Sequence, residues 1–211
     1  MGKCHGGVFA NWTKKVGNVV GRIVDGENVY SIYQPNVSNP NTAAQRAVRS
    51  NFSLLTEMLA KTANFGKQGM INYRTKGTWL SSLIGLNYDT AITGTYPNNS
   101  INFTKLILSK GILDNALNLA AQVQGQDMNF AWTDNSGMGN AEENDKFALL
   151  IYNKDKKVAI YDTAAASRSS RQTTYTLPTA WTGDGVEVYG YFYSPTKNIV
   201  SGSQYLGAFT L

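Results

Sequence analysis

Residues 16–59 read VGNVVGRIVDGENVYSIYQPNVSNPNTAAQRAVRSNFSLLTEML, and this stretch predicts a β-hairpin, a loop and an amphipathic helix. Residues 16–24 and 29–34 are rich in β-branched and aromatic side chains, which favour strands. They flank DGEN, residues 25–28, a glycine-containing connection of hairpin length. Gly17 and Gly21 would share a face of one extended strand. Either that face is flat enough for another backbone or ring to approach, or the glycines mark local bulges.

The helix is predicted from the residues that follow the hairpin. Residues 35–41 contain two prolines among asparagine and serine, so they cannot continue a sheet. The next four residues, TAAQ at 42–45, match a capping box, in which side chains satisfy free backbone N–H groups. Arg46 and Arg49 lie on the exposed side of this helix, and Gly66 is expected to end the segment. The apolar positions form one stripe facing a core: Val48, Phe52, Leu55 and Leu59.

A second helix is predicted at residues 79–86, where tryptophan, leucine and isoleucine recur, and it is expected to pack on the first. The sequence YPNNS at residues 96–100 indicates a turn and a domain boundary. The predicted organisation is therefore a basic hairpin-helix assembly segment at residues 1–100 and a second domain at residues 101–211.

The second domain is predicted to consist of short β-strands separated by turns. This spacing is typical of an antiparallel sandwich of the immunoglobulin or fibronectin type III kind. The predicted fold class is α+β and mostly β: an N-terminal hairpin with one or two helices, followed by that sandwich. A low-complexity AAASRSS stretch at residues 164–170 is expected to be a mobile loop. The predicted strands are residues 104–108, 117–124, 128–133, 146–152, 158–162, 172–177, 186–194 and 203–209.

The predicted strand at residues 186–194 alternates between tyrosines and smaller or apolar residues. Tyr189, Tyr191 and Tyr193 fall on one face of an extended strand, and residues 188, 190 and 192 fall on the other. If the second set belongs to the core, the tyrosines form an exposed ridge suited to protein or carbohydrate contact. The alternative is that another segment of the same chain covers them.

The charge of the chain is unevenly distributed. Charged residues make up 16% of the sequence, below the roughly 25% usual for soluble domains. Residues 1–80 carry ten Lys/Arg and three acids, a net +7, whereas residues 81–211 carry nine and eleven, a net −2. A basic N-terminal part could meet nucleic acid, an acidic protein surface or a neighbouring subunit's acidic half.

The sequence contains few of the residues that catalysis or metal binding commonly needs. His5 is the only histidine and Cys4 the only cysteine, which nearly excludes Ser-His-Asp, Cys-His and multi-histidine metal sites and excludes an intrachain disulfide. The glycine-containing residues 17–22 lack the GK[ST] ending of a phosphate loop. Residues 134–145 hold several acids without calcium-hand spacing, so a turn is favoured over a cation site. We therefore predict no enzyme, cofactor or metal.

The N-terminus and the hydropathy pattern bear on where the protein acts. The sequence MGKCHGGVFANW lacks the apolar run of a signal peptide. No stretch approaches the roughly 20 apolar residues of a membrane span. We expect a chain made in the cytoplasm without a membrane partner, located in the virion if the protein is viral and otherwise cytoplasmic.

Three motifs in order resemble a known family. They are GNVVG…VYSIYQP…NPNTAAQRAVRSNF, ITGTYPNNSINFTKLILSKG, and FAWTDNSGMGNAEENDKFALLIYN…LPTAWTGDGVEVYGYFYS…SGSQYLG, which together span nearly the whole chain. They resemble an uncharacterised family of proteins of about this length from Bacteroidota and their phages and prophages. The family supplies no activity or catalytic residues to transfer. Its hairpin, NPxTxxQ motif and basic helix are similar to those of short proteins encoded among virion structural genes.

This resemblance implies a capsid-decorating, connector or fibre-like role. We therefore expect a non-enzymatic assembly subunit whose partners are further copies of itself and other virion or assembly proteins. The first alternative is a nucleic-acid-associated protein that binds phosphates through Arg46, Arg49, Lys61, Lys67, Arg74 and Lys76. The second alternative is a surface carbohydrate- or protein-binding module. The residues expected to contact assembly partners are Val19, Arg22, Val29, Tyr30, Tyr33, Arg46 and Arg49.

Overall fold

The computed structural model describes residues 2–4, 12–36, 39–73 and 77–211. The described chain is mostly β, with three α-helices and several antiparallel sheets. It divides into two compact units, Met1–Thr42 and Ala43–Leu211, called here the N-terminal unit and the main unit. The division lies at residues 42 and 43 and not near residue 100, because the helices share a hydrophobic core with strands of the main unit.

The N-terminal unit is a four-stranded antiparallel sheet in the order β1-β4-β3-β2. Strands β3 and β4 form the predicted hairpin. The residues between them, Asp25 and Gly26, have φ angles of 52° and 83°. Positive φ at both central residues is the requirement of the tight hairpin turn that matches strand twist. The bounds of the four strands are β1 Gly2–Cys4, β2 Lys14–Val16, β3 Val19–Val24 and β4 Glu27–Ile32.

The prediction of one continuous strand at residues 16–24 is wrong. Gly17, with φ of 58°, and Asn18 form a turn between β2 and β3. The two glycines therefore do not share a strand face, and only Gly21 has the predicted close neighbour. A Cβ atom at Gly21 would lie 2.5 Å from the backbone oxygen of Trp12 and 2.9 Å from the ring of Tyr30. Glycine is needed there because both groups approach the backbone closely.

The main unit begins with three helices. Helix α1 starts at Ala43, directly after the predicted cap, and α1 packs against α3 as expected. The predicted apolar stripe of α1 is correct only in its second half. Leu55 and Leu59 are fully buried, whereas Val48 and Phe52 are 56% and 51% exposed. The helix bounds are α1 Ala43–Ala60, α2 Ala63–Gly69 and α3 Trp79–Asn87.

The expectation that Gly66 ends the helical segment is wrong, because Gly66 lies inside α2. A Cβ atom at Gly66 would lie 2.6 Å from the Thr62 hydroxyl and 2.9 Å from the ring of Trp79. The lack of a side chain therefore allows α2 and α3 to approach closely. Helix α3 begins after Thr78, whose hydroxyl accepts a hydrogen bond from the Ser81 N–H at 3.2 Å.

Two antiparallel sheets form the rest of the main unit. The three-stranded sheet has the order β11-β8-β7, and the five-stranded sheet has the order β10-β9-β12-β13, with β14 also paired to β12. Two short strands, β5 (Ile92–Thr93) and β6 (Ser100–Ile101), pair with each other. The strands of the two larger sheets are β7 Leu117–Gln124, β8 Asp127–Thr133, β9 Lys146–Asn153, β10 Val158–Ser167, β11 Gln172–Thr176, β12 Gly185–Ser194, β13 Ile199–Val200 and β14 Gln204–Thr210.

Most predicted strands of this region are present, with two corrections. Residues 104–108 do not form a strand, since Phe103–Lys105 is a 3₁₀ helix followed by extended, unpaired residues. Strand β10 continues to Ser167, and residues 168–170 form another 3₁₀ helix, so the loop predicted at residues 164–170 is wrong. The small side chains of this stretch do not make it a loop, because β10 pairs with β9 as far as Ser167.

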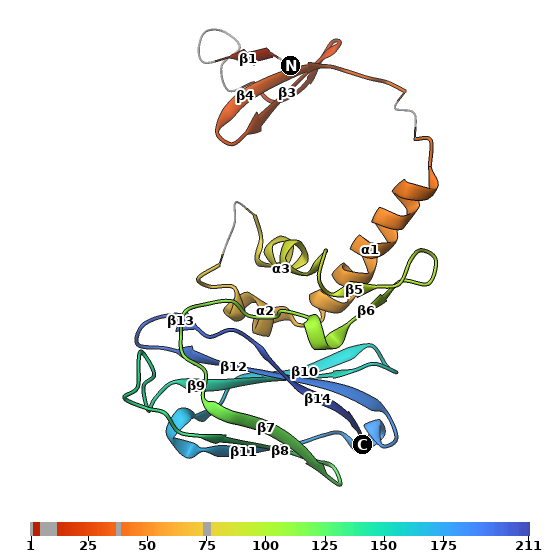
Figure 1. Cartoon of the computed structure of the whole chain (residues 1–211). Helices are drawn as coiled ribbons and strands as arrows, with labels where there is room; N and C mark the ends of the chain where they lie inside the picture. The colour runs from red at the N-terminus through yellow and green to blue at the C-terminus, as the bar shows by residue number, and fades with distance from the viewer. Residues whose placement is uncertain (1, 5–11, 37–38, 74–76) are drawn as a thin grey trace. The chain divides into compact units, whose positions relative to one another are not determined.

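The five-stranded sheet is covered on both faces. Figure 1 shows the three helices on one face and the three-stranded sheet on the other. Alternate residues of β9 and β12 enter the two cores, so both strands are buried almost throughout. The core between the sheets contains Phe130, Trp132, Phe147, Leu149, Ile151, Val186, Val188 and Phe192. The core beneath the helices contains Leu55, Phe65, Leu83, Ala148, Leu150, Tyr152, Tyr189 and Tyr191.

Arg168, inside the region expected to be a loop, is completely buried. Its guanidinium donates to Asp145 at 3.1 Å, to the Asn135 side-chain oxygen at 2.7 Å and to the Asp114 backbone oxygen at 2.8 Å. The guanidinium carbon lies 4.3 Å from the centre of the Phe192 ring. Burial lowers the pKa of Arg168, and the Asp145 charge opposes that effect. Arg168 therefore joins three separate segments at one end of the two sheets.

Candidate interaction surfaces

The seven residues predicted to contact a partner lie on both units. Arg46 and Arg49 belong to α1 of the main unit, and the other five belong to the N-terminal unit. Val29 is only 6% exposed, so it supports the sheet and offers no contact surface. Tyr30 is half-buried and stacks on Trp12, with ring centroids 5.5 Å apart. The remaining five are exposed, and the Tyr33 ring lies 3.4 Å from the Lys15 ammonium.

The register of the N-terminal sheet separates its residues into two faces. Residues paired across strands share a face, and successive residues alternate between faces. Val19 pairs with Val16 and Ile32, Gly21 with Tyr30, and Ile23 with Asn28, so these residues lie on the same side. We call this side the open face, because four of its aliphatic side chains are exposed. Their exposed fractions are Val16 59%, Val19 37%, Ile23 54% and Ile32 77%.

The other side of the same sheet carries most of its charge, and we call it the charged face. Lys3 pairs with Val29, which pairs with Arg22, and Val24 pairs with Glu27. The Lys3 ammonium lies 2.5 Å from the Glu27 carboxylate. Among the described strand residues that belong to the open face, Lys14 is the only Lys, Arg, Asp or Glu.

Helix α1 presents a second exposed apolar surface. A shallow hollow beside the helix is lined by residues between Val48 and Glu57. Its apolar walls come from Val48 and Phe52, the two stripe residues that the main unit leaves exposed. The predicted partner residue Arg49 lies at its edge.

The predicted exposed ridge of tyrosines is wrong, and the alternative of a covering segment is correct. Tyr189 and Tyr191 are fully buried beneath the helices, and Tyr193 is half-buried. The Tyr189 hydroxyl donates to the Phe103 backbone oxygen at 2.7 Å. The Tyr191 hydroxyl lies 2.9 Å from the Phe65 backbone oxygen and 2.8 Å from the Gln68 side-chain oxygen. Burial raises the pKa of both tyrosines well above the ordinary value.

The acidic loop at residues 134–145 is held by its own hydrogen bonds. Asp134 accepts from the backbone N–H and the hydroxyl of Ser136 at 2.9 and 2.6 Å, and these bonds lower its pKa. Asp145 accepts from the Glu142 N–H at 2.8 Å and from Arg168. In the described part of the chain no group of His, Cys, Asp and Glu side chains has a metal-binding arrangement. His5, Arg74 and Lys76 lie outside the described residues.

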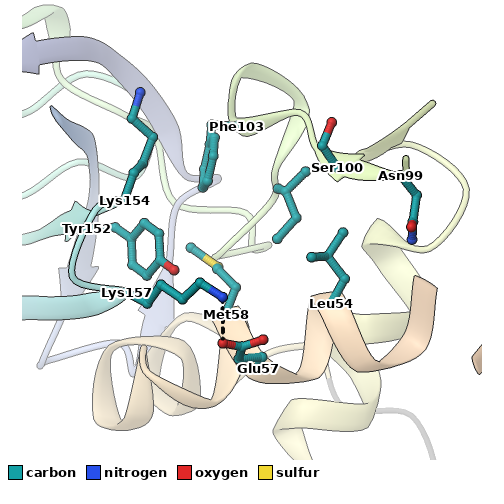
Figure 2. Close-up of a pocket in the computed structure, with 10 residues that line it drawn as sticks. Leu54, Glu57, Met58, Asn99, Ser100, Phe103, Tyr152, Lys154 and Lys157 are labelled. Carbon is teal, nitrogen blue, oxygen red and sulfur yellow. Dashed lines mark hydrogen bonds and ion pairs between the residues drawn. The ribbon is translucent and has the colours of Figure 1, made fainter. Parts of the chain in front are cut away.

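The main unit also contains a cavity of about 250 Å³, which the sequence analysis did not predict. Figure 2 shows that its lining comes from α1, from the segment around β6 and from the end of β9 with the turn that follows. Its walls are mainly apolar, and an ion pair between Lys157 and Glu57, 3.2 Å apart, lies at its edge. The residues that line it are Leu54, Glu57, Met58, Asn99, Ser100, Ile101, Phe103, Tyr152, Lys154 and Lys157.

The helices give no sign of a membrane span. Among the residues that the structure describes, none of the helices combines the length and the apolar character needed to cross a bilayer.

No curated protein matches the chain. The model of a family of unknown function, DUF6266, matches residues 10–207. This match confirms the resemblance to an uncharacterised family that the three motifs indicate, and it covers the strands and helices of both units except β1 and the end of β14. The chain therefore belongs to DUF6266, a family of unknown function.

Proposed function

We propose that this protein is a non-enzymatic structural subunit that associates with further copies of itself through the open face of its N-terminal sheet. The observation that carries the proposal is the exposure of Val16, Val19, Ile23 and Ile32 on one side of a small four-stranded sheet. A sheet gains stability by packing its apolar face, and exposed apolar side chains that gather on one face commonly mark a site of association. Val16, Val19 and Ile32 are neighbours in register, whereas Ile23 lies beyond Gly21 and Tyr30, which Trp12 covers.

The energetic gain from covering this face is considerable for so small a unit. Complete burial of one Val or Ile side chain contributes about 1.5–3 kcal/mol relative to full exposure. The four side chains are already 23–63% buried, from the exposed fractions above, so a covering partner adds part of that gain for each. Ile32 and Val16 would contribute most because they are the most exposed.

The charge distribution supports a second copy as the partner. Lys3, Lys15, Arg22 and Glu27 lie on the charged face. Two open faces could therefore pack together while most like charges point away from the interface. Repulsion between like charges, which would oppose association of two basic surfaces, is thereby reduced.

The proposal extends to a role in a virion, as a capsid-decorating, connector or fibre-like part. Its support is the similarity of the hairpin, the NPxTxxQ motif and the basic helix to short proteins of virion structural genes. It assigns no catalytic residue: within residues 134–145, Asp134 binds its own loop and Asp145 pairs with Arg168. The genes adjacent to the coding sequence test this part, because capsid, portal or tail genes are expected there and a metabolic operon would contradict it.

We propose in addition that the two larger sheets form a sandwich of the immunoglobulin or fibronectin type III kind. If β7 is counted as the first strand and the two-residue β13 is omitted, the first, second and fifth strands form one sheet. The third, fourth, sixth and seventh form the other, which supports this topology. An experimental structure in which β10 leaves β9 and pairs with β11 would contradict the fibronectin-like arrangement.

Size-exclusion chromatography with light scattering tests the association of the full chain. The unmodified protein is expected to elute as an oligomer that dissociates on dilution. Ile23→Glu and Ile32→Glu place a charge on the open face and are expected to give monomers. The matched control is Val24→Glu, because Val24 is 47% exposed on the same strand as Ile23 but lies on the charged face. A monomeric unmodified protein at high concentration, or equal effects of the Ile23 and Val24 variants, would contradict the proposal.

A second candidate function, nucleic-acid binding, is favoured by the charge of α1, α2 and the residues that join them. Arg46, Arg49, Lys61 and Lys67 are exposed, and Glu57 is the only acid in this segment. Phosphate contacts release counterions, so binding to DNA or RNA should weaken steeply as salt rises. Absence of DNA and RNA retention at low salt would exclude this function.

A further inference from the structure

Helix α1 is covered by the main unit over only part of its length, and its first turns lie away from the two larger sheets (Figure 1). The residues that it buries all lie in its second half: Leu55, Met58 and Leu59. Its middle is held from one side, where the Ser50 hydroxyl donates to the Asn99 side-chain oxygen at 3.0 Å and the Asn99 amide donates to Asn51 at 2.7 Å. Two positions along a helix correspond to about half a turn, so residues 48, 49, 52 and 53 lie on the opposite side. This opposite side contains the shallow hollow described above.

Two parallel rows of side chains form this side of the helix. Residues four positions apart are neighbours on a helix surface, so each row takes every fourth residue. The apolar row is Val48, Phe52 and Thr56, of which the first two are 56% and 51% exposed. The charged row is Arg49, Ser53 and Glu57. The hollow is lined by these six residues, so apolar surface and both signs of charge meet there.

The charged row is complementary to itself. It has a cation at one end and an anion at the other, about 12 Å apart along the helix axis, with Ser53 midway. When a second copy of α1 runs antiparallel with its Ser53 at the same point, Arg49 of each copy comes beside Glu57 of the other. A twofold axis repeats every contact, so two ion pairs form at once. A uniformly acidic partner would attract Arg49 but repel Glu57, so the row favours a second copy.

The apolar row supplies the surface that this pairing covers. Phe52 is adjacent to Ser53 in the sequence, so the Phe52 rings of both copies lie close to the twofold axis. Rows of residues four apart form the ridges that pack into the grooves of a second helix, and the small Ser53 side chain leaves room for this approach. Aromatic residues at the centre of an interface commonly contribute most to binding, which assigns the main apolar contact to Phe52.

The ion pair that Glu57 makes within the chain is compatible with this arrangement. The Lys157 ammonium lies 3.2 Å from the Glu57 Oε1 atom, and both side chains are more than half exposed. Exposed pairs of this kind contribute little to stability. A carboxylate also has a second oxygen, so Oε2 of Glu57 can accept from Arg49 of the second copy while Oε1 keeps its lysine.

We propose that α1 pairs antiparallel with α1 of a second copy, with Phe52 at the centre and reciprocal Arg49–Glu57 ion pairs on both sides. The contact involves about three turns of one helix from each copy, less than a standard protein–protein interface. Its Kd is expected to be on the order of 0.1 mM, so it leaves the protein monomeric at the micromolar concentrations of size-exclusion chromatography. If the open face also associates, as proposed above, each subunit has two self-associating surfaces, and alternation of the two contacts joins subunits into an extended assembly.

Sedimentation equilibrium of the full chain tests the pairing in a background that carries Ile23→Glu and Ile32→Glu. These substitutions remove association through the open face, so a dimer that remains uses another surface. A monomer–dimer equilibrium with a Kd on the order of 0.1 mM is expected. Arg49→Glu and Glu57→Arg each bring like charges together at two places and are expected to weaken the dimer about tenfold or more.

The double charge variant is the decisive measurement. Arg49→Glu combined with Glu57→Arg exchanges the two charges and restores both ion pairs, so its Kd is expected within about threefold of the starting value. An acidic partner surface or a nonspecific effect of charge predicts no such recovery.

Two controls and one apolar variant separate the contact from other effects of these substitutions. Lys157→Ala removes the intrachain partner of Glu57 and is expected not to weaken the dimer. Lys67→Glu reverses an exposed charge on α2 that does not line the hollow, and the Kd is expected to change less than about twofold. Phe52→Ala removes the central ring, and a loss of about tenfold in affinity is expected. The folding of each variant is checked by its thermal transition.

Three outcomes would overturn the proposal: no dimer at about 1 mM protein, single charge reversals that leave the Kd unchanged, or a double variant that associates no more tightly than the single ones. The same charge variants are measured in the otherwise unmodified chain, so that a failure of the open face is recognised separately. If Ile23→Glu and Ile32→Glu leave the association of the chain unchanged, the open-face proposal fails, whereas the recovery in the double charge variant still decides the α1 contact.

Discussion

The N-terminal sheet and the five-stranded sheet of the main unit differ in how their faces are covered. In the N-terminal sheet, Val16, Val19, Ile23 and Ile32 are exposed on one face. In the five-stranded sheet, β9 and β12 bury almost every residue because helices cover one face and another sheet covers the other. The comparison indicates that the main unit obtains its stability within one chain, whereas the N-terminal sheet still has apolar surface to cover.

The largest effect is expected from alkaline pH on the main unit. The folded-state pKa values of Tyr189 and Tyr191 are raised, so the unfolded chain ionises near pH 10 while the folded chain keeps both protons. The part of the folding stability that depends on these two hydroxyls staying protonated is fully present below about pH 10 and is lost as pH rises above it. Two such tyrosines reduce the free energy of unfolding by about 2.7 kcal/mol per pH unit. Urea unfolding between pH 8 and pH 12 measures the slope, and a flat profile would contradict it.

Removal of the buried guanidinium comes next. Arg168→Ala leaves the Asp145 carboxylate buried and without its ion pair, which should destabilise the main unit by about 3–5 kcal/mol. Chemical denaturation measures this loss. Arg46→Ala serves as the control, because Arg46 is exposed on α1, and a change of less than about 0.5 kcal/mol is expected there.

Two isoleucines compare the covered and the open sheet directly. Ile151 is fully buried between the two larger sheets, so Ile151→Ala should cost about 2–5 kcal/mol. Ile32 is 77% exposed, and Ile32→Ala should change the stability of the monomer by less than about 0.5 kcal/mol while weakening self-association. Denaturation at low protein concentration and light scattering at high concentration separate the two readouts. A large loss of monomer stability in Ile32→Ala would show that the open face is already covered within the chain.

Two tyrosine hydroxyls of the same sheet face provide a smaller comparison. Tyr191→Phe leaves the buried Phe65 backbone oxygen and the Gln68 side chain without that donor, at a cost of about 1–3 kcal/mol. Tyr152→Phe removes a hydroxyl that bonds to no described residue and should cost nothing. Thermal unfolding of both variants is the measurement, and equal losses would mean that Tyr152 has a partner in the folded protein.

The smallest effect is expected from the exposed ion pair at the cavity edge. Both side chains of the Lys157–Glu57 pair are more than half exposed, so Glu57→Gln should change the free energy of unfolding by about 0–1 kcal/mol. The effect should shrink further when salt is raised to 1 M. A salt-independent loss larger than this range would indicate that the pair holds α1 against the turn after β9.

The elements that the sequence predicted correctly have local causes. Asp25 and Gly26 allow the tight turn of the N-terminal hairpin, and the TAAQ motif marks the start of α1. Trp79 and the leucines after it predict α3, and the alternating or apolar runs predict seven of the eight strands proposed for the second half. Each of these signals involves residues within a few positions of each other, so no knowledge of distant contacts is needed.

The errors arise where a distant segment decides the environment. Tyr189 and Tyr191 alternate with core residues, as exposed residues would, but the helices cover them. Arg168 lies in a serine- and alanine-rich stretch that is typical of loops, yet Asp114, Asn135 and Asp145 surround its guanidinium. Gly66 resembles a helix terminator, but Trp79 and Leu83 come close enough to require glycine within α2.

By itself the sequence determined the family, the turn of the hairpin, α1, α3 and most of the strands, because periodicity, turn residues and motifs are local or directly readable properties. Only the tertiary structure decided which faces are buried, where the units divide and that Val48 and Phe52 stay exposed on α1. The physical reason is that burial depends on which segments pack together, and those segments are far apart in the sequence, as Phe65 and Tyr191 are with a separation of 126 residues. The exposed face of the N-terminal sheet also emerged only from the strand register, which assigns Val16, Val19, Ile23 and Ile32 to one side.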